Sequence, residues 1–228
     1  MKKLALTAAL LLAPALVFLC PGVKAGGSDV SIVNPNAYDH LIRVACVGDS
    51  ITQGVCISEP ERNGYPAQLQ MMLGPKWEVK NFGVGGRTML RKADTYDIGP
   101  ALSYKPDVII IMLGTNDSKI NIWSAHKDEF IGDYLDVIKA FRDLETHPKI
   151  YLCLPPPCFP GNWGITETAI VNEVIPAIKK TAETAKLPVI DLHTPLKDSK
   201  SLFPDNVHPD KAGARIIAEN VAKALIGD

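Results

Sequence analysis

Apolar positions in this chain fall into five short runs that are separated by longer amphipathic segments. The runs have the length and the β-branched content of strands, and they cover Ile42 to Val47, Trp77 to Phe82, Val108 to Leu113, Ile150 to Leu154 and Val189 to Leu192. The third run is apolar at every position, as expected for a central strand that helices cover on both faces. Alternation of such runs with helical segments predicts a parallel sheet.

Helical periodicity characterises the segments between the strands. It predicts helices near Tyr65 to Leu73, Lys127 to Leu144, Thr166 to Ala185 and Lys211 to Leu225. In the last helix, Ala212, Ile216, Val221 and Leu225 recur at near-helical spacing and form the predicted buried stripe. We expect Pro176 to bend the third helix. No repeat or linker interrupts the pattern, so we predict a single three-layer α/β/α domain.

The first residues have the composition of an export signal. Two lysines at positions 2 and 3 precede an uncharged run from Leu4 to Leu19, and Val23 to Ala25 offers a small-residue cleavage site. We therefore predict a signal peptide over residues 1–25 and a mature domain over residues 26–228, exported to the periplasm or secreted.

Two other interpretations of this N-terminal segment are disfavoured. A membrane anchor would need about 20 apolar residues, and Pro14 and Pro21 interrupt the run. A lipid-modified Cys20 would need a small preceding residue, whereas Leu19 is bulky. After cleavage we expect no stable insertion into a membrane.

Composition and charge point to an ordinary globular protein. The chain has 228 residues, of which 46% are hydrophobic and 21% charged, which suits one domain with a substantial core. Its 24 basic and 25 acidic residues give a net charge of −1, and the predicted signal peptide holds three lysines and no acid. The mature protein is therefore more acidic, so we expect no nucleic-acid partner.

Four cysteines lie beyond the predicted signal peptide. Cys46 and Cys153 fall within apolar strand runs, where thiols behave as small buried hydrophobes. If a disulfide forms after export, Cys56 and Cys158 are the favoured pair because both lie in loops. The sequence contains no Cys-x-x-Cys pair and no His-Glu-x-x-His motif, so we expect neither a metal nor a cofactor.

The first predicted strand leads directly into Gly48-Asp49-Ser50-Ile51-Thr52-Gln53-Gly54. This sequence places the Ser50 hydroxyl on a turn at the carboxyl edge of the sheet, where open α/β folds bind ligands. Taken alone, Ser50 is either a nucleophile or part of a helix cap. The stretch is not a Gly-x-Ser-x-Gly elbow, because Thr52 occupies the final glycine position.

Two further loops are expected at the same edge. Asn81 to Thr88 is rich in glycine and could hold an anion on backbone amides, but it fits neither a dinucleotide fingerprint nor a Walker motif. We therefore interpret it as an oxyanion-binding loop. Gly114-Thr115-Asn116-Asp117 is by itself a turn sequence, in which Asn116 could donate a neutral hydrogen bond to developing negative charge.

The loop before the last helix holds a carboxylate and an imidazole three residues apart, at Asp205 and His208. That spacing lets one local turn present both groups together. By itself, a histidine before a proline in a loop is usually an ordinary surface residue. His193 also falls at the carboxyl edge of the sheet, but no motif surrounds it, and we expect it to have a structural role.

The joint occurrence of these loops changes the interpretation of each one. Gly-Asp-Ser, Asn-x-Gly-x-x-Gly, Gly-Thr-Asn-Asp and Asp-x-x-His occur in the order typical of the SGNH, or GDSL-like, hydrolase family, which the sequence resembles over essentially its whole mature length. The resemblance implies a flavodoxin-like fold with a five-stranded parallel sheet. It also implies a serine esterase that forms an acyl-enzyme.

The resemblance assigns a role to each matching residue. It implies Ser50 as the nucleophile, His208 as the general base and Asp205 as the carboxylate that orients the base. The backbone amides of Ser50 and Gly86 and the side-chain amide of Asn116 would form the oxyanion hole. Gly86 is chosen over Gly83 because the family glycine is the last one of its motif. These roles agree with the chemistry of a serine activated by a neutral imidazole.

The stretch Pro155-Pro156-Pro157-Cys158-Phe159, followed by Trp163-Gly164-Ile165, resembles the secreted carbohydrate-esterase branch, including sialate O-acetylesterase-like proteins. We therefore expect hydrolysis of acetyl esters on a sugar or polysaccharide. A lysophospholipase or thioesterase on the same fold, and a non-catalytic carbohydrate-binding protein, are the alternatives.

The composition of the remaining loops bears on the size of the acyl group that the site can hold. We expect a shallow cleft with Trp163 as a candidate platform for a sugar ring, although packing within its own loop explains this residue equally well. The loops left over are polar or rich in Gly and Pro, and no lid helix is expected in them: Ile51 to Gly64, Arg87 to Gly99, Ser118 to Ala125 and Pro155 to Gly164.

Overall fold

The computed structural model describes residues 32–93, 97–161 and 163–227, and the predicted signal peptide lies outside these residues. Five strands form one sheet in the order β2-β1-β3-β4-β5, and every neighbouring pair is parallel. Each strand lies within one residue of its predicted ends. The strands are β1 Ile42–Gly48, β2 Trp77–Gly83, β3 Val108–Met112, β4 Lys149–Leu154 and β5 Val189–Asp191.

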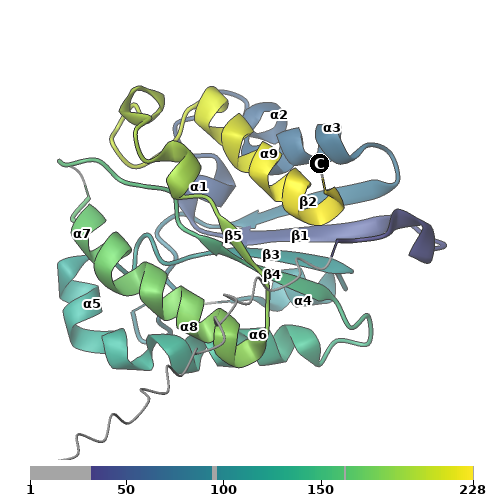
Figure 1. Cartoon of the computed structure of the whole chain (residues 1–228), viewed down its shortest axis with the longest axis horizontal. Helices are drawn as coiled ribbons and strands as arrows, with labels where there is room; N and C mark the ends of the chain where they lie inside the picture. The colour runs from purple at the N-terminus through teal and green to yellow at the C-terminus, as the bar shows by residue number, and fades with distance from the viewer. Residues whose placement is uncertain (1–31, 94–96, 162, 228) are drawn as a thin grey trace, which may run out of the picture.

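The sheet lies between two helical layers (Figure 1). Helices α1, α2, α3 and α9 cover one face, and α4, α5, α6, α7 and α8 cover the other. The α-helices are α1 Ser50–Gln53, α2 Pro60–Asn63, α3 Tyr65–Leu73, α4 Gly99–Ser103, α5 Ile120–His126, α6 Phe130–Arg142, α7 Glu167–Ala169, α8 Ile175–Ala185 and α9 Lys211–Ile226.

The central strand explains why both faces are covered. Val108, Ile110 and Met112 belong to the hydrophobic cluster under α3 and α9, whereas Ile109 and Ile111 belong to the cluster under α6 and α8. All five side chains are at most 1% exposed. Successive side chains of a strand point to opposite faces, so a fully apolar strand requires helices on both. The three-layer prediction is confirmed.

The predicted stripe on α9 is partly wrong. Ala212 is exposed and Ile216 is only half-buried, while Val221 and Leu225 are buried as predicted. The buried face begins instead at Gly213, where an added Cβ would lie 2.8 Å from the Pro209 Cβ. Small residues on this face let α9 lie close to α3 and the preceding loop, which periodicity alone does not reveal. The buried residues of α9 are Gly213, Ala214, Ile217, Ala218, Val221, Ala222 and Leu225.

Two helical segments differ from the prediction. The segment predicted from Lys127 begins with a 3₁₀ turn, Lys127–Glu129, and α6 starts only at Phe130. The expected absence of a helix from Ser118 to Ala125 is wrong, because α5 occupies most of this segment. Its buried Trp123 packs edge-on against Phe130, and this tertiary contact stabilises a helix of only 7 residues.

Between α7 and α8 the chain forms a π-helical turn, Ile170–Val174. Pro176 then lies in the first turn of α8. Proline has no backbone N–H, and an N–H in the first turn of a helix would have no acceptor within that helix. The change from π-helical to α-helical hydrogen bonding therefore occurs where the proline costs least.

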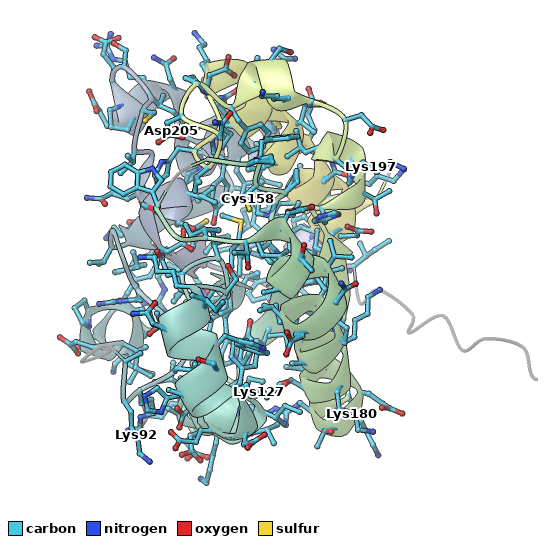
Figure 2. All side chains as sticks on the ribbon, turned by 90° about the vertical axis from the view of Figure 1, so that its left-hand side faces the viewer. Lys92, Lys127, Cys158, Lys180, Lys197 and Asp205 are labelled. Atoms are coloured by element: carbon cyan, nitrogen blue, oxygen red, sulfur yellow. The ribbon has the colours of Figure 1, made fainter. Side chains whose placement is uncertain are left out.

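All four cysteines within the described residues are free thiols. Cys46 and Cys153 are buried in β1 and β4 as predicted. The favoured pair, Cys56 with Cys158, is not joined. Cys158, which Figure 2 labels, is buried in the core cluster under α8, while Cys56 is exposed in the turn that directly follows α1. Among the described residues, no helix has the length and apolar character needed to cross a membrane.

Candidate active site

The turn between β1 and α1 sets the position of Ser50. Asp49 caps α1, because its Oδ1 accepts a hydrogen bond of 2.9 Å from the Ile51 N–H. Gly48 has to be glycine, since a Cβ there would lie 2.0 Å from the Thr52 Oγ1. Ser50 is therefore the first residue of a short helix at the carboxyl edge of β1, with its side chain partly exposed. The residue that caps α1 is Asp49, so the helix-cap interpretation does not apply to Ser50.

Three side chains from two distant segments are joined by hydrogen bonds. The His208 Nε2 lies 2.8 Å from the Ser50 Oγ, and the His208 Nδ1 lies 2.6 Å from the Asp205 Oδ2. The other carboxylate oxygen of Asp205 accepts the backbone N–H groups of Val207 and His208, at 3.0 and 2.8 Å. The turn from Asp205 to His208 therefore holds both side chains before α9 begins, as the three-residue spacing predicts.

The charge of Asp205 determines which ring nitrogen of His208 carries the proton. Partial burial alone would raise the pKa of Asp205, but hydrogen bonds from the backbone and side chain of His208 and from the Val207 N–H lower it to about 2. An ionised carboxylate only accepts hydrogen bonds, so the Nδ1 of a neutral His208 must donate to it. The Nε2 is then free to accept the hydroxyl hydrogen of Ser50.

Gly86 and Asn116 lie beside Ser50 and His208 around one cleft with a volume of about 310 Å³. Gly86 has a φ of +79°, and nothing lies within 4 Å of the position where its Cβ would be. Gly83 has a different role, because a Cβ there would lie 2.2 Å from the Gln53 backbone nitrogen. The structure therefore places Gly86, the glycine chosen from the motif, on this cleft.

The buried Asn116 side chain is fixed by the neighbouring glycine-rich loop. Its Nδ2 donates a hydrogen bond of 3.1 Å to the Arg87 carbonyl oxygen, and the residue is 4% exposed. A side-chain amide has two N–H groups, so one remains for a ligand in the cleft. Donors that are held in place before reaction are what an oxyanion site requires.

Sequence reasoning gave no role to Asp117, although it lies in the third motif. Asp117 is fully buried, and its carboxylate accepts the backbone N–H groups of Met89 and Leu90 at 2.9 to 3.0 Å. It therefore ties the loop after β3 to the glycine-rich loop after β2. The motif indicated that Asp117 belongs to the site. Its hydrogen-bond partners, however, are backbone amides, which no pattern of residue types identifies.

Asp49 is a second buried carboxylate near the first. It is 1% exposed, and its Oδ2 has no hydrogen-bond partner. Burial, together with the charge of Asp117, raises the pKa of Asp49 to about 7 against the opposing hydrogen bond from Ile51. The folded protein therefore holds a proton on Asp49 under conditions in which an exposed aspartate is ionised.

Asp49→Asn should make the free energy of unfolding less dependent on pH. An aspartate in the unfolded chain ionises near pH 4, whereas Asp49 in the fold ionises near pH 7. The unfolded state therefore loses this proton first, and wild-type stability falls as pH rises between these values and stays lower above them. Asparagine cannot ionise and keeps an oxygen for the Ile51 N–H.

Urea unfolding at pH 4.5 and pH 8 measures this effect. We expect the variant to gain a few kcal/mol relative to wild type at the higher pH, since each unit of pKa shift corresponds to about 1.4 kcal/mol. Asp198→Asn, at a side chain that is 89% exposed, is the matched control and should not alter the pH dependence. An unchanged pH dependence in Asp49→Asn would contradict the raised pKa.

His193 is held away from this catalytic arrangement. Its Nε2 lies 2.7 Å from the Glu167 Oε1, and the Glu167 Oε2 accepts the Cys158 N–H at 2.8 Å. These bonds connect the end of β5 to α7 and to the proline-rich loop. The arrangement agrees with the structural role expected for His193.

Comparison with known proteins identifies the family. The sequence profile of the GDSL-like lipase/acylhydrolase family matches residues 46–216. The chain belongs to this family. The matched region of this GDSL-like family member contains all four motif loops and all five positions assigned to the triad and the oxyanion hole. The resemblance seen in the sequence is therefore confirmed at the level of the family.

One relative is similar to this GDSL-like protein in sequence over most of the chain. An acetylxylan esterase from Xylanibacter ruminicola is 41% identical over 214 residues, which cover 84% of this chain. The alignment covers 44% of that relative, so this chain spans less than half of its length.

Solved structures agree with the fold. The crystal structure of the acetyl xylan esterase AlAXEase is 27% identical, with a TM-score of 0.62 over 81% of this chain and 100% of that one. A putative arylesterase from Agrobacterium tumefaciens is 25% identical, with a TM-score of 0.64 over 79% of this chain and 96% of that one. The five-stranded α/β fold predicted from sequence is confirmed.

Proposed function

We propose that this protein is a serine esterase that removes acetyl groups from carbohydrates. The observation that carries the proposal is the hydrogen-bonded series Ser50, His208 and Asp205, which opens onto a cleft lined by Gly86 and Asn116. The relatives named as acetylxylan esterases support an acetylated glycan as the substrate.

In the proposed reaction, the Ser50 Oγ attacks the ester carbonyl carbon while the His208 Nε2 takes the hydroxyl proton. The backbone N–H groups of Ser50 and Gly86 and the Asn116 amide donate to the negative oxygen of the tetrahedral intermediate. Asp205 stabilises the imidazolium that has formed. Collapse of the intermediate releases the sugar hydroxyl, which receives the proton from His208, and leaves acetyl-Ser50.

Water completes the cycle by the same steps. His208 takes a proton from a water molecule, and the resulting hydroxide attacks the acyl carbonyl. The second tetrahedral intermediate uses the same donors, and its collapse returns the proton to Ser50 and releases acetate.

The size of the cleft supports a short acyl group. Its volume is about 310 Å³, and Trp163 and Ile165 line it together with Ser50. A long acyl chain gains about 0.8 kcal/mol per buried methylene, but only where apolar walls replace water. The cleft therefore suits an acetyl group on a large polar alcohol better than a lipid chain.

Trp163 is placed to contact the alcohol part of the substrate. Its side chain is 64% exposed, and its ring centre lies 6.3 Å from that of His208 in an edge-on arrangement. An exposed indole beside the general base offers an apolar face against which a sugar ring can pack. This geometry favours the platform interpretation of Trp163 over packing within its loop.

Trp163→Ala should weaken binding of glycan esters without slowing the chemistry. Loss of about 40 Å² of apolar contact corresponds to ~1 kcal/mol, so we expect KM for acetylated xylo-oligosaccharides to rise about fivefold. The value of kcat for p-nitrophenyl acetate should change little, because that ester has no sugar. Trp163→Phe keeps an aromatic face and should recover most of the affinity; equal KM values for wild type and Trp163→Ala would contradict the platform.

The experiment that tests the function compares acyl donors and alcohols. Purified protein should release acetate from acetylated xylan and should hydrolyse p-nitrophenyl acetate faster than butyrate or octanoate, judged by kcat/KM. Octanoate preferred over acetate, with no acetate released from any glycan, would favour the lysophospholipase or thioesterase alternative. No turnover, and no labelling of Ser50 by a fluorophosphonate, would favour a carbohydrate-binding protein.

We also propose that the protein is exported after removal of residues 1–25. The lysines, the uncharged run and the small-residue site at the N-terminus support this proposal. A polymeric glycan substrate is compatible with it, since such substrates lie outside the cell. Sequencing the N-terminus of the protein recovered from the periplasm or the medium tests it, and an uncleaved N-terminus would contradict it.

A further inference from the structure

A thiol, a carboxylate and an imidazole meet at the solvent side of the active site. The Cys56 Sγ donates to the Asp205 Oδ2 at 3.5 Å, and the His208 Nδ1 lies 2.6 Å from the same oxygen. One ligand atom from each of the three residues lies within 4.8 Å of the other two. Across the described ranges this is the one group of three such side chains close enough to hold a metal ion.

We propose that Cys56, Asp205 and His208 form a binding site for a thiophilic divalent cation such as zinc or cadmium, and that occupation of this site switches the enzyme off. The inhibitory consequence rests on the proposed esterase function, whereas binding of the ion does not. The sequence contains no metal motif because Cys56 lies 149 residues before Asp205.

The three ligand types suit this class of ion. Zinc in proteins takes sulfur at about 2.3 Å and nitrogen or oxygen at about 2.0 to 2.2 Å, usually in a tetrahedron. Two such ligands on one ion are therefore some 3 to 4 Å apart, which small side-chain rotations can reach from the present separations. The thiolate favours zinc or cadmium over magnesium, which prefers oxygen ligands.

The three residues are accessible to an ion from solvent. Cys56 is exposed, and the Asp205 side chain is 21% exposed, whereas the His208 side chain is 8% exposed. An ion would thus meet the thiol and the carboxylate first and would reach the imidazole last. The fourth position of the tetrahedron would face solvent and could hold water.

Binding at the Nδ1 would remove the base. In the metal-free triad the single proton of neutral His208 is on Nδ1, where it is donated to Asp205. A metal ion on Nδ1 uses the lone pair of that nitrogen, so the proton moves to Nε2. The thiol proton of Cys56 is released to solvent. Nε2 then carries a hydrogen and cannot accept the proton of Ser50, so acylation stops although the protein stays folded.

The test uses reduced, metal-free protein and measures both activity and binding. Hydrolysis of p-nitrophenyl acetate should be inhibited by Zn²⁺ and Cd²⁺, should recover on addition of EDTA, and should be unaffected by the same concentration of Mg²⁺. Cys56→Ser keeps a hydroxyl that can donate to Asp205, so its rate without metal should stay within about twofold of wild type. Its inhibition constant for either ion should rise at least tenfold.

Cadmium also reports on the thiolate directly, without any activity. Wild type and Ser50→Ala should both develop the ultraviolet absorption of a cadmium–thiolate bond at one equivalent of Cd²⁺, because Ser50 is not a ligand. Cys56→Ser should not develop it. Cys158→Ala, which removes a buried thiol, should keep the wild-type absorption and separate this site from the other free cysteines.

The outcomes distinguish this proposal from the proposed function. Equal inhibition of wild type and Cys56→Ser, or the same absorption in both proteins, would overturn the metal site even if the protein is an active esterase. Absorption that depends on Cys56 in a protein without esterase activity would leave the metal site standing and would refute the function instead.

Discussion

Ser50→Ala and His208→Ala should each lower kcat for acetyl ester hydrolysis by roughly 10⁵- to 10⁶-fold, the scale seen when a serine or histidine is removed from such a triad. Without the hydroxyl there is no atom to carry the acyl group. Without the imidazole, the hydroxyl that lies 2.8 Å from Nε2 keeps its proton. Asp205→Ala should lose less, about 10⁴-fold, because Asp205 orients and stabilises His208 without transferring a proton.

Steady-state kinetics with p-nitrophenyl acetate measures these losses, and thermal unfolding shows whether each variant is folded. Ser124→Ala removes another exposed serine hydroxyl, one that bonds the Ile120 carbonyl within α5, and should keep the wild-type rate. A fluorophosphonate should label wild type and Ser124→Ala but not Ser50→Ala. Wild-type turnover by folded, pure Ser50→Ala protein would refute the assigned nucleophile.

Asn116→Asp should lower kcat by about 10² to 10³, or ~3 to 4 kcal/mol, although it hardly changes the size of the side chain. The substitution replaces the amide that donates to the Arg87 carbonyl with a carboxylate that can only accept. It also places a negative charge where the oxyanion develops. The effect should therefore fall on kcat, with little change in KM.

Asn116→Ala separates the donor from the packing of the loop. Both variants lose the bond to Arg87, so both should show a similar loss of thermal stability, but only the aspartate adds repulsion of the oxyanion. We expect Asn116→Asp to be at least as slow as Asn116→Ala. If Asn116→Asp retains kcat while Asn116→Ala loses it, Asn116 positions the loop and does not donate to the transition state.

The elements that pattern alone predicted well are those with a regular environment. All five strands were found within one residue of their predicted ends, and β1, β3 and β4 are almost entirely buried apolar runs. Helix α3 has its predicted bounds because Gly64 and Gly74 flank it. The stripe on α9 was shifted, since Gly213 and the alanines beside it pack closely without being strongly hydrophobic. Periodicity measures hydrophobicity, and small residues at a close helix contact contribute little to it.

One helix and one connection between the motif loops depended on contacts that sequence spacing does not encode. Helix α5 forms in a segment that was expected to be a loop, because Trp123 is buried against Phe130. Asp117 joins two motif loops through the amides of Met89 and Leu90, groups that every residue carries. Neither a side-chain pattern nor a motif can specify such partners.

By itself, the sequence determined the family, the five parallel strands, the four loops at their carboxyl edge and the residue types that supply a nucleophile, a base and donors. These follow from local patterns, because strand length, turn residues and the three-residue spacing of Asp205 and His208 are properties of adjacent positions. Only the tertiary structure decided that Ser50 lies 2.8 Å from a histidine 158 residues away, that Trp163 borders the cleft, and that Cys56 points at Asp205. Such contacts depend on how the loops of a closed, close-packed domain are brought together, and sequence separation carries no information about that distance.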